Sequence, residues 1–267
     1  MEFDIRESRL PLLALAIHNG HAIDPEVEPY LVPDEFMRLK EEDPLTGFFA
    51  RISPNFMIVN TSRFQTDLNR PREDALYRSP EQAWGMEVWK KDTPQKVMLK
   101  LLQDYDYFYR QLDRCVKRLI RAHGYLVVFD FHSYNHRRSV DGTQADPTEN
   151  PEINIGTGTL NRELWAPVVD YFQNCLHGHG YMGRKLDVRE NIKFKGGHLS
   201  AWIHEHYSDR SCVLAIEVKK IFMDEHTGAI NILHLRELKK AFEAIVPGVL
   251  QVAEKIGASK FSNQITG

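Results

Sequence analysis

The sequence predicts an α/β fold, in which a sheet is covered by helices on both of its faces. Four short apolar runs have the composition of strands that are buried on both faces: residues 11–17, 57–61, 125–131 and 213–216. Helical patterns alternate with these runs, which favours a sheet between two helical layers. Each run ends at or near a polar residue, namely His18, Arg63, His132 and Glu217. Because ligands of open α/β sheets bind outside the carboxyl ends of the strands, we expect these four side chains to gather there.

The helical segments are expected between and after the strands. The strongest pattern covers residues 93–123, where apolar side chains recur at helical spacing before Gly124. Further helices are predicted over 160–176 and 232–257, and Pro247 should kink or split the last one. Residues 135–158 are charged and then rich in Gly and Pro, so a long loop is expected there.

Length and charge narrow the class of protein. A chain of 267 residues with 42% hydrophobic and 27% charged residues can bury a sizeable core, and we expect one domain over 1–267. The formal net charge is −3. That balance gives no basic patch for nucleic acid and no attraction to an anionic membrane, so neither partner is expected.

Cysteine usage favours a reducing compartment. Cys115, Cys175 and Cys212 are far apart and odd in number, and they match neither a disulfide framework nor a thiolate metal site. The apolar run 10–17 is too short to cross a bilayer. We therefore expect a cytoplasmic protein.

Two histidines follow the first strand, in the sequence His18-Asn-Gly-His21. Gly20 allows a sharp turn that would direct the His18 imidazole towards the crevice, where it is a candidate metal ligand. The alternative is a capping or hydrogen-bonding role for His18, and His21 has the further alternative of stabilising the turn.

An acidic run, Glu41-Glu42-Asp43-Pro44, provides possible oxygen ligands. Asp43 precedes a proline that would restrict its backbone, so it is a candidate metal ligand. The alternative is a solvated acidic surface.

Two arginines lie near the end of the second strand, in the segment Arg63-Phe-Gln-Thr-Asp67-Leu-Asn69-Arg70. The planar guanidinium binds carboxylates through two hydrogen bonds, so Arg63 and Arg70 are candidates for gripping an anionic substrate. The alternative is a pair of structural ion pairs in which Asp67 holds either arginine.

The strongest local signal for a metal is Asp130-Phe-His132, followed by basic residues up to Arg137 and Arg138. Alternation along a strand places Asp130 and His132 on the same face. A histidine that binds a metal often donates its other ring nitrogen to a carboxylate, and Asp130 is placed for that role.

Glu217 ends the fourth apolar run. A buried carboxylate is costly unless it is paired or has a function, and here that function would be general-base catalysis. The alternative is a salt bridge to Lys219 or Lys220.

In this order, the motifs resemble those of the N-formylglutamate amidohydrolase family, a distant relative of the zinc carboxypeptidases and aspartoacylases. They span about 200 residues, and Asp-Leu-Asn-Arg-Pro and Asp-x-His-Ser are the most specific; the motif residues are His18-Asn-Gly, Glu42-Asp43, Ser62-Arg63, Asp67 to Pro71, Asp130 to Ser133 and Ile216-Glu217.

The resemblance implies a three-layer α/β/α sandwich with a mixed, mostly parallel sheet. It also implies one zinc per chain, held by His18, His132 and a third ligand, for which we prefer Asp43 and keep His21 as the rival. Glu217 falls at the position of the general base.

The resemblance further implies how a substrate would be held. Arg63 would stabilise the developing oxyanion, and Asn69 and Arg70 would anchor a substrate carboxylate. Arg137 adds positive charge beside the site, which suggests an acidic or larger substrate.

The function implied is hydrolysis of a small, anionic N-acylated amino acid, such as N-formylglutamate, by a zinc-dependent amidohydrolase. One alternative is a carboxypeptidase-like hydrolase of a peptide or conjugate. Another is a catalytically silent relative that binds an acidic ligand, since the HxxE pair of the carboxypeptidases is replaced here by His18 and His21.

Overall fold

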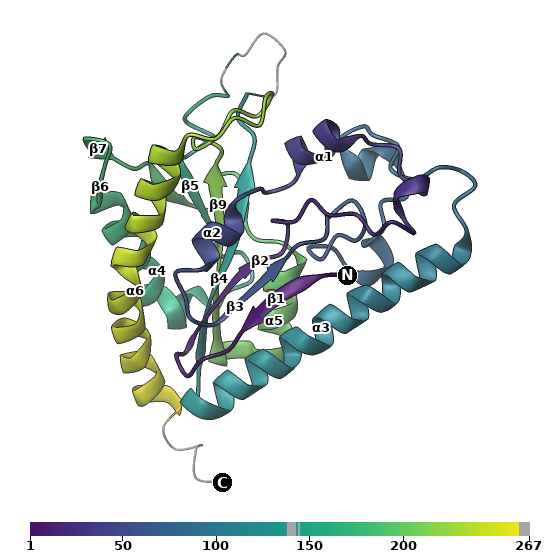
Figure 1. Cartoon of the computed structure of the whole chain (residues 1–267). Coiled ribbons are helices and arrows are strands. Elements are labelled where there is room, and N and C mark those ends of the chain that lie inside the picture. The colour runs from purple at the N-terminus through teal and green to yellow at the C-terminus, as the bar shows by residue number, and fades with distance from the viewer. Residues whose placement is uncertain (138–142, 144, 262–267) are drawn as a thin grey trace.

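A mixed, mostly parallel sheet forms the centre of the protein (Figure 1). The computed structural model describes residues 1–137, 143 and 145–261. The central strands run parallel, whereas β1 and β5 are antiparallel to the strands β3 and β9 that they pair with, and β8 is parallel to β5. In sheet order the strands are β1 (Phe3–Arg6), β3 (Phe56–Val59), β2 (Leu12–Ala16), β4 (Leu126–Tyr134), β9 (Ser211–Lys219), β5 (Ile153–Gly156) and β8 (Val188–Glu190).

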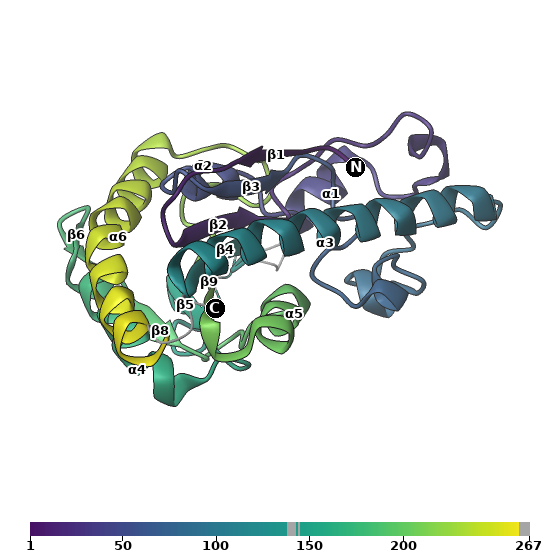
Figure 2. The same ribbon diagram turned by 90° about the horizontal axis from the view of Figure 1, so that it is seen from below.

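Helices cover both faces of the sheet (Figure 2), as the sequence predicts. Side chains of α2, α4 and α6 pack on one face, and those of α3 and α5 pack on the other. The helices are α1 (Glu35–Glu41), α2 (Thr46–Ala50), α3 (Gln95–His123), α4 (Arg162–Gly178), α5 (His198–Tyr207) and α6 (Ile232–Phe261). Short 3-10 turns and a two-stranded hairpin complete the list: Glu28–Tyr30, Arg72–Asp74, Pro80–Ala83, Ser208–Arg210, and β6 (Gly180–Tyr181) with β7 (Arg184–Lys185).

Alternation along β4 decides which side chains reach the site. Val127 and Phe129 pack into the core beneath α4 and α6, whereas Leu126 and Val128 pack with α3. The same alternation carries Asp130 and His132 onto the side of α3 and α5, at the carboxyl end of the strand.

The predicted helices are present, with one difference at Pro247. α3 ends at His123 as predicted, and Gly124 follows it with a φ of +80°, the left-handed conformation typical of a residue after a helix. α6 continues through Pro247 as one helix, so the splitting considered for that position does not occur.

The prediction of one long loop over residues 135–158 is wrong in part. Residues 153–156 form β5, whose buried Asn154 accepts a hydrogen bond from the backbone N–H of Lys193 and donates to the carbonyl of Phe194. Four residues are too few to show a clear period in sequence. Residues 138–142 and 144 of the predicted loop lie outside the described part of the chain.

Within the described ranges, no helix is both long enough and apolar enough to cross a membrane.

Candidate metal centre and active site

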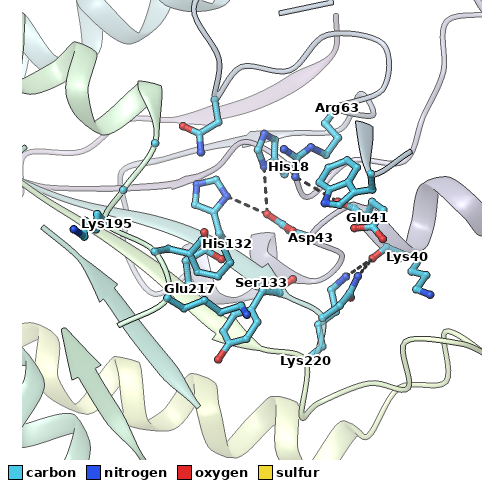
Figure 3. Close-up of a pocket in the computed structure, with 18 residues that line it drawn as sticks. His18, Lys40, Glu41, Asp43, Arg63, His132, Ser133, Lys195, Glu217 and Lys220 are labelled. Atoms are coloured by element: carbon cyan, nitrogen blue, oxygen red, sulfur yellow. Dashed lines mark hydrogen bonds and ion pairs between the residues drawn. The ribbon is translucent and has the colours of Figure 1, made fainter. Parts of the chain in front are cut away.

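His18, Asp43 and His132 meet at the carboxyl edge of the sheet, although they are far apart in sequence (Figure 3). His18 lies just beyond β2, His132 lies near the end of β4, and β2 and β4 are parallel neighbours. Asp43 comes from the segment between α1 and α2. Its backbone N–H donates to the carbonyl of His18 over 2.9 Å, which ties this segment to the end of β2.

The three side chains form a buried donor set. Oδ2 of Asp43 lies 3.3 Å from Nδ1 of His18 and 3.0 Å from Nδ1 of His132. Nδ1 of His18 makes no hydrogen bond with the described residues, although it is buried. Two imidazoles and one carboxylate suit zinc, and catalytic zinc sites commonly keep three protein ligands and one open position. The residues therefore fit a metal ion.

Each histidine has a carboxylate behind it. Nε2 of His18 lies 2.7 Å from Oδ1 of Asp67, and Nε2 of His132 lies 3.1 Å from Oδ2 of Asp130. Such carboxylates orient the imidazoles of metal ligands. The position of Asp130 agrees with the sequence prediction. The sequence predicts Asp67 only as a partner for arginine, so its contact with His18 is found only in the structure.

Asp67 is the centre of a dense polar network. Besides His18, it accepts hydrogen bonds from Arg63 Nη2 at 2.8 Å, from the backbone N–H of Asn69 at 2.9 Å, from Arg70 Nε at 3.3 Å and from the Tyr77 hydroxyl. Burial alone would raise the pKa of Asp67, but the charges of Arg63 and His18 hold it well below its usual value. Both arginines thus make the ion pairs that the sequence left open.

The protonation states within the donor set follow from burial and charge. Burial opposes ionisation of Asp43, but its hydrogen bond with His132 and its ion pair with His18 outweigh it and keep the pKa of Asp43 below its usual value. Burial alone would lower the pKa of His132, yet the carboxylates of Asp130 and Asp43 hold it well above its usual value. A metal ion would replace the proton in this arrangement.

Glu217 lies beside His132, since the two residues are direct partners in the pairing of β4 with β9. Burial raises the pKa of Glu217 to about 7, with His132 opposing this rise. A carboxyl group whose pKa is close to neutral is suited to both accepting and releasing a proton.

A cavity of about 380 Å³ opens beside these residues. Several lysines and three aromatic side chains line it in addition to the candidate ligands; its wall includes Lys40, Glu41, Arg63, Asn69, Trp84, Ser133, Tyr134, Lys193, Phe194, Lys195, Gly197, Glu217 and Lys220. Lys40 and Trp84 were not predicted, because they lie in segments whose place in the fold the sequence does not reveal.

Comparisons with known proteins agree with this architecture. The family model of N-formylglutamate amidohydrolase matches residues 10–223. The chain belongs to the N-formylglutamate amidohydrolase family. Membership supports an amidohydrolase function. A search of curated proteins finds no match.

Two solved structures share the fold. N-formylglutamate amidohydrolase from Ralstonia eutropha is 19% identical, with a TM-score of 0.74, and the match covers 96% of this chain and 98% of that one. A gene product of Agrobacterium tumefaciens is 17% identical, with a TM-score of 0.62, and the match covers 96% of this chain and 95% of that one. At these identities the likeness establishes the fold alone.

His21, the rival candidate for the third metal ligand, lies apart from the cluster. Its Nδ1 is paired with Glu42, and its Nε2 lies 3.5 Å from Glu35. The hydrogen bond with Glu42 raises the pKa of His21. This pairing favours Asp43 over His21 as the third donor.

The predicted substrate contacts separate into two groups. Arg63 and Asn69 line the cavity. Arg70 is not part of the cavity wall; its Nη2 donates to the carbonyl of Gln82, and its guanidinium lies 4.9 Å from the Tyr77 ring centre. Arg137 lines a different hollow, together with Lys219 and His234.

Asn69 also shapes the cavity wall. Its Oδ1 accepts a hydrogen bond from the N–H of Leu199 in the first turn of α5. A Cβ at Gly197 would lie 2.3 Å from the Asn69 side chain, so the backbone here must be glycine to approach this closely.

Proposed function

We propose that this protein is a zinc-dependent amidohydrolase that cleaves the acyl-amide bond of a small N-acylated amino acid, such as N-formylglutamate, to a carboxylate and an amino acid. The observation that carries the proposal is the buried group of His18, Asp43 and His132 with Glu217 as the strand partner of His132. Free thiols at Cys115, Cys175 and Cys212 fit the cytoplasmic location that we propose with it.

His18, Asp43 and His132 would hold the zinc. When bound, zinc would lower the pKa of water to about 7 and polarise the acyl oxygen. Glu217 takes a proton from the attacking water and returns it to the leaving amine, a role that suits a pKa of about 7. Asp67 and Asp130 keep the two imidazoles oriented.

Arg63 is the proposed support for the developing negative charge on the acyl oxygen. Its guanidinium is held by Asp67, by the Tyr77 hydroxyl at 3.0 Å and by the carbonyl of Glu41 at 3.3 Å. A donor that is already fixed needs no reorganisation during the reaction.

The cavity favours a small anionic substrate. Its volume of about 380 Å³ is at the lower end of the range for small-molecule sites. Lys40, Lys193 and Lys195 in its wall add positive charge that suits a carboxylate. Asn69 reaches the cavity, so within this proposal it is better placed than Arg70 or Arg137 to contact the substrate directly.

The first test is the metal content of the purified protein, measured by elemental analysis on the wild type and on His132→Ala. We expect about one zinc per chain in the wild type and its loss in the variant. No zinc in either protein, even after zinc is supplied, would contradict the proposed metal centre.

The second test separates catalysis from binding. Glu217→Gln should abolish turnover of N-acyl amino acids while zinc stays bound, because the amide cannot accept the proton. A near-normal rate would rule out Glu217 as the base. Short peptides assayed alongside N-acyl amino acids would reveal a carboxypeptidase-like activity, and zinc binding without any amide hydrolysis would indicate a silent binding protein.

A further inference from the structure

Lys220 is a buried lysine directly beneath the segment that carries Asp43. It follows the last residue of β9, and its side chain is only 1% exposed. Nζ donates a hydrogen bond of 2.8 Å to the carbonyl of Lys40 (Figure 3). It donates a second one, also of 2.8 Å, to the carbonyl of Glu42. The backbone N–H of Lys220 donates to the carbonyl of Tyr134 over 3.0 Å, so its own position is fixed by β4.

Asp43 needs such support more than the two histidines do. His132 is within a central strand and His18 immediately follows one, whereas Asp43 lies on the irregular link between α1 and α2. The carbonyls at the end of a helix have no partners within the helix. Lys220 donates hydrogen bonds to two carbonyls at the end of α1. The carbonyl of Lys40 also accepts a hydrogen bond of 2.8 Å from Asn135 Nδ2.

We propose that Lys220 is a positioning residue that fixes Asp43 for metal binding. Burial of an ammonium group is costly unless the group is hydrogen-bonded. Here the ammonium of Lys220 bonds to the carbonyls of Glu42, which directly precedes Asp43, and of Lys40. The α1 end of the link, next to Asp43, is thereby set against β4 and β9, the strands that carry His132 and Glu217. This inference rests on the metal centre proposed above.

The test compares the zinc affinity of metal-stripped proteins by competition with a chromophoric chelator. Lys220→Met should bind zinc about 10- to 100-fold more weakly than the wild type, the usual range for loss of a group that supports a ligand. Lys219→Met is the matched control: Lys219 is the preceding residue, is partly buried and lines the other hollow. Its zinc affinity should equal that of the wild type.

Two further variants separate positioning from general stability. Lys220→Arg keeps a cation with several donors and should restore most of the affinity. Lys220→Gln keeps one donor group and should give an intermediate loss; it also serves if Lys220→Met fails to fold. The absorption spectrum of the Co²⁺-loaded protein reports the ligand set, and we expect it to change in Lys220→Met but not in Lys219→Met.

A folded Lys220→Met or Lys220→Gln protein with wild-type zinc affinity and an unchanged Co²⁺ spectrum would overturn the role of Lys220 and leave the metal centre intact. A wild-type protein that takes up no zinc would instead refute the metal centre itself, and the role of Lys220 with it.

Discussion

The two halves of the candidate metal centre are supported in opposite ways. Asp67, behind His18, accepts hydrogen bonds from two arginines, a tyrosine and a backbone amide. Asp130, behind His132, is fully buried, and neither of its oxygens accepts a hydrogen bond from any residue in the described ranges. Among those residues, it forms an ion pair with His132. The first carboxylate is therefore stabilised whether or not a metal is present. The second depends on positive charge at His132, which a proton or a metal ion would supply.

The most direct test of this contrast is to replace each of the two carboxylates, Asp67 and Asp130, by asparagine. Asp67→Asn should destabilise the protein by about 3–5 kcal/mol, because the Arg63 guanidinium would lose its buried counter-charge. Urea denaturation of the metal-stripped protein would measure the loss. A free energy of unfolding equal to that of the wild type would show that the network around Asp67 is not structural.

Asp130→Asn should affect zinc affinity and leave the stability of the metal-stripped protein nearly unchanged. The substitution removes a buried charge with little hydrogen bonding, so we expect little change in the stability of the metal-stripped protein. Zinc affinity should fall about 10- to 100-fold, because His132 would lose the carboxylate that orients it. If Asp130→Asn instead unfolds the protein as readily as Asp67→Asn does, the two halves are not different in kind.

A half-buried histidine, His204, extends the comparison to a site without any carboxylate. Its ring nitrogens contact the Thr159 hydroxyl at 2.8 Å and the N–H of Val213 at 3.2 Å. Burial lowers the pKa of His204 to about 4. Between that value and about 6.5 the unfolded chain binds a proton that the folded chain excludes, so stability falls as pH falls through this window.

The expected size of this effect is about 1–2 kcal/mol between pH 7 and pH 5, after allowance for partial exposure. His204→Gln should flatten that part of the stability profile, as followed by urea denaturation at several pH values. An unchanged pH dependence would mean that the pKa of His204 is the same in the folded and the unfolded protein.

The smallest effect is expected at Arg70. Because Arg70 is absent from the cavity wall while Arg63 is part of it, Arg70→Lys should change KM for an N-acyl amino acid only slightly, and Arg63→Lys should reduce kcat/KM strongly. Steady-state kinetics of the two variants would decide. Equal losses would return Arg70 to the role of direct substrate contact that the sequence suggested.

The site residues that follow strands were predictable from the strand pattern, whereas Asp43, on an irregular segment, was preferred as a ligand only through the family resemblance. Apolar runs identify β2, β4 and β9, and the alternation of β4 gives the shared face of Asp130 and His132. The contact between Asp67 and His18 depends on how the residues after β3 fold back, and nothing in their spacing shows it. The sequence indicates Lys220 only as a possible partner for Glu217. Its hydrogen bonds to the segment that carries Asp43 are long-range contacts, which sequence spacing does not reveal.

The β5 strand was missed for a related reason. Its four residues have a buried Asn154 that is satisfied by residues 193 and 194, so its stability comes from a distant segment and not from its own apolar pattern. α5 likewise begins beside Asn69, whose side chain accepts from its first turn. Local propensity cannot reveal partners of this kind.

The order of the site residues along the chain has a consequence for biogenesis. His18 and Asp43 are synthesised early, but His132 and Glu217 come from β4 and β9, which pair in parallel across a long intervening segment. Parallel pairing of strands that are far apart in sequence forms slowly, because the entropy cost of closing a large loop comes before any stabilising contact is made. A nascent chain on the ribosome would therefore expose two of its donors well before the third can join them, and we expect metal uptake to come after chain release.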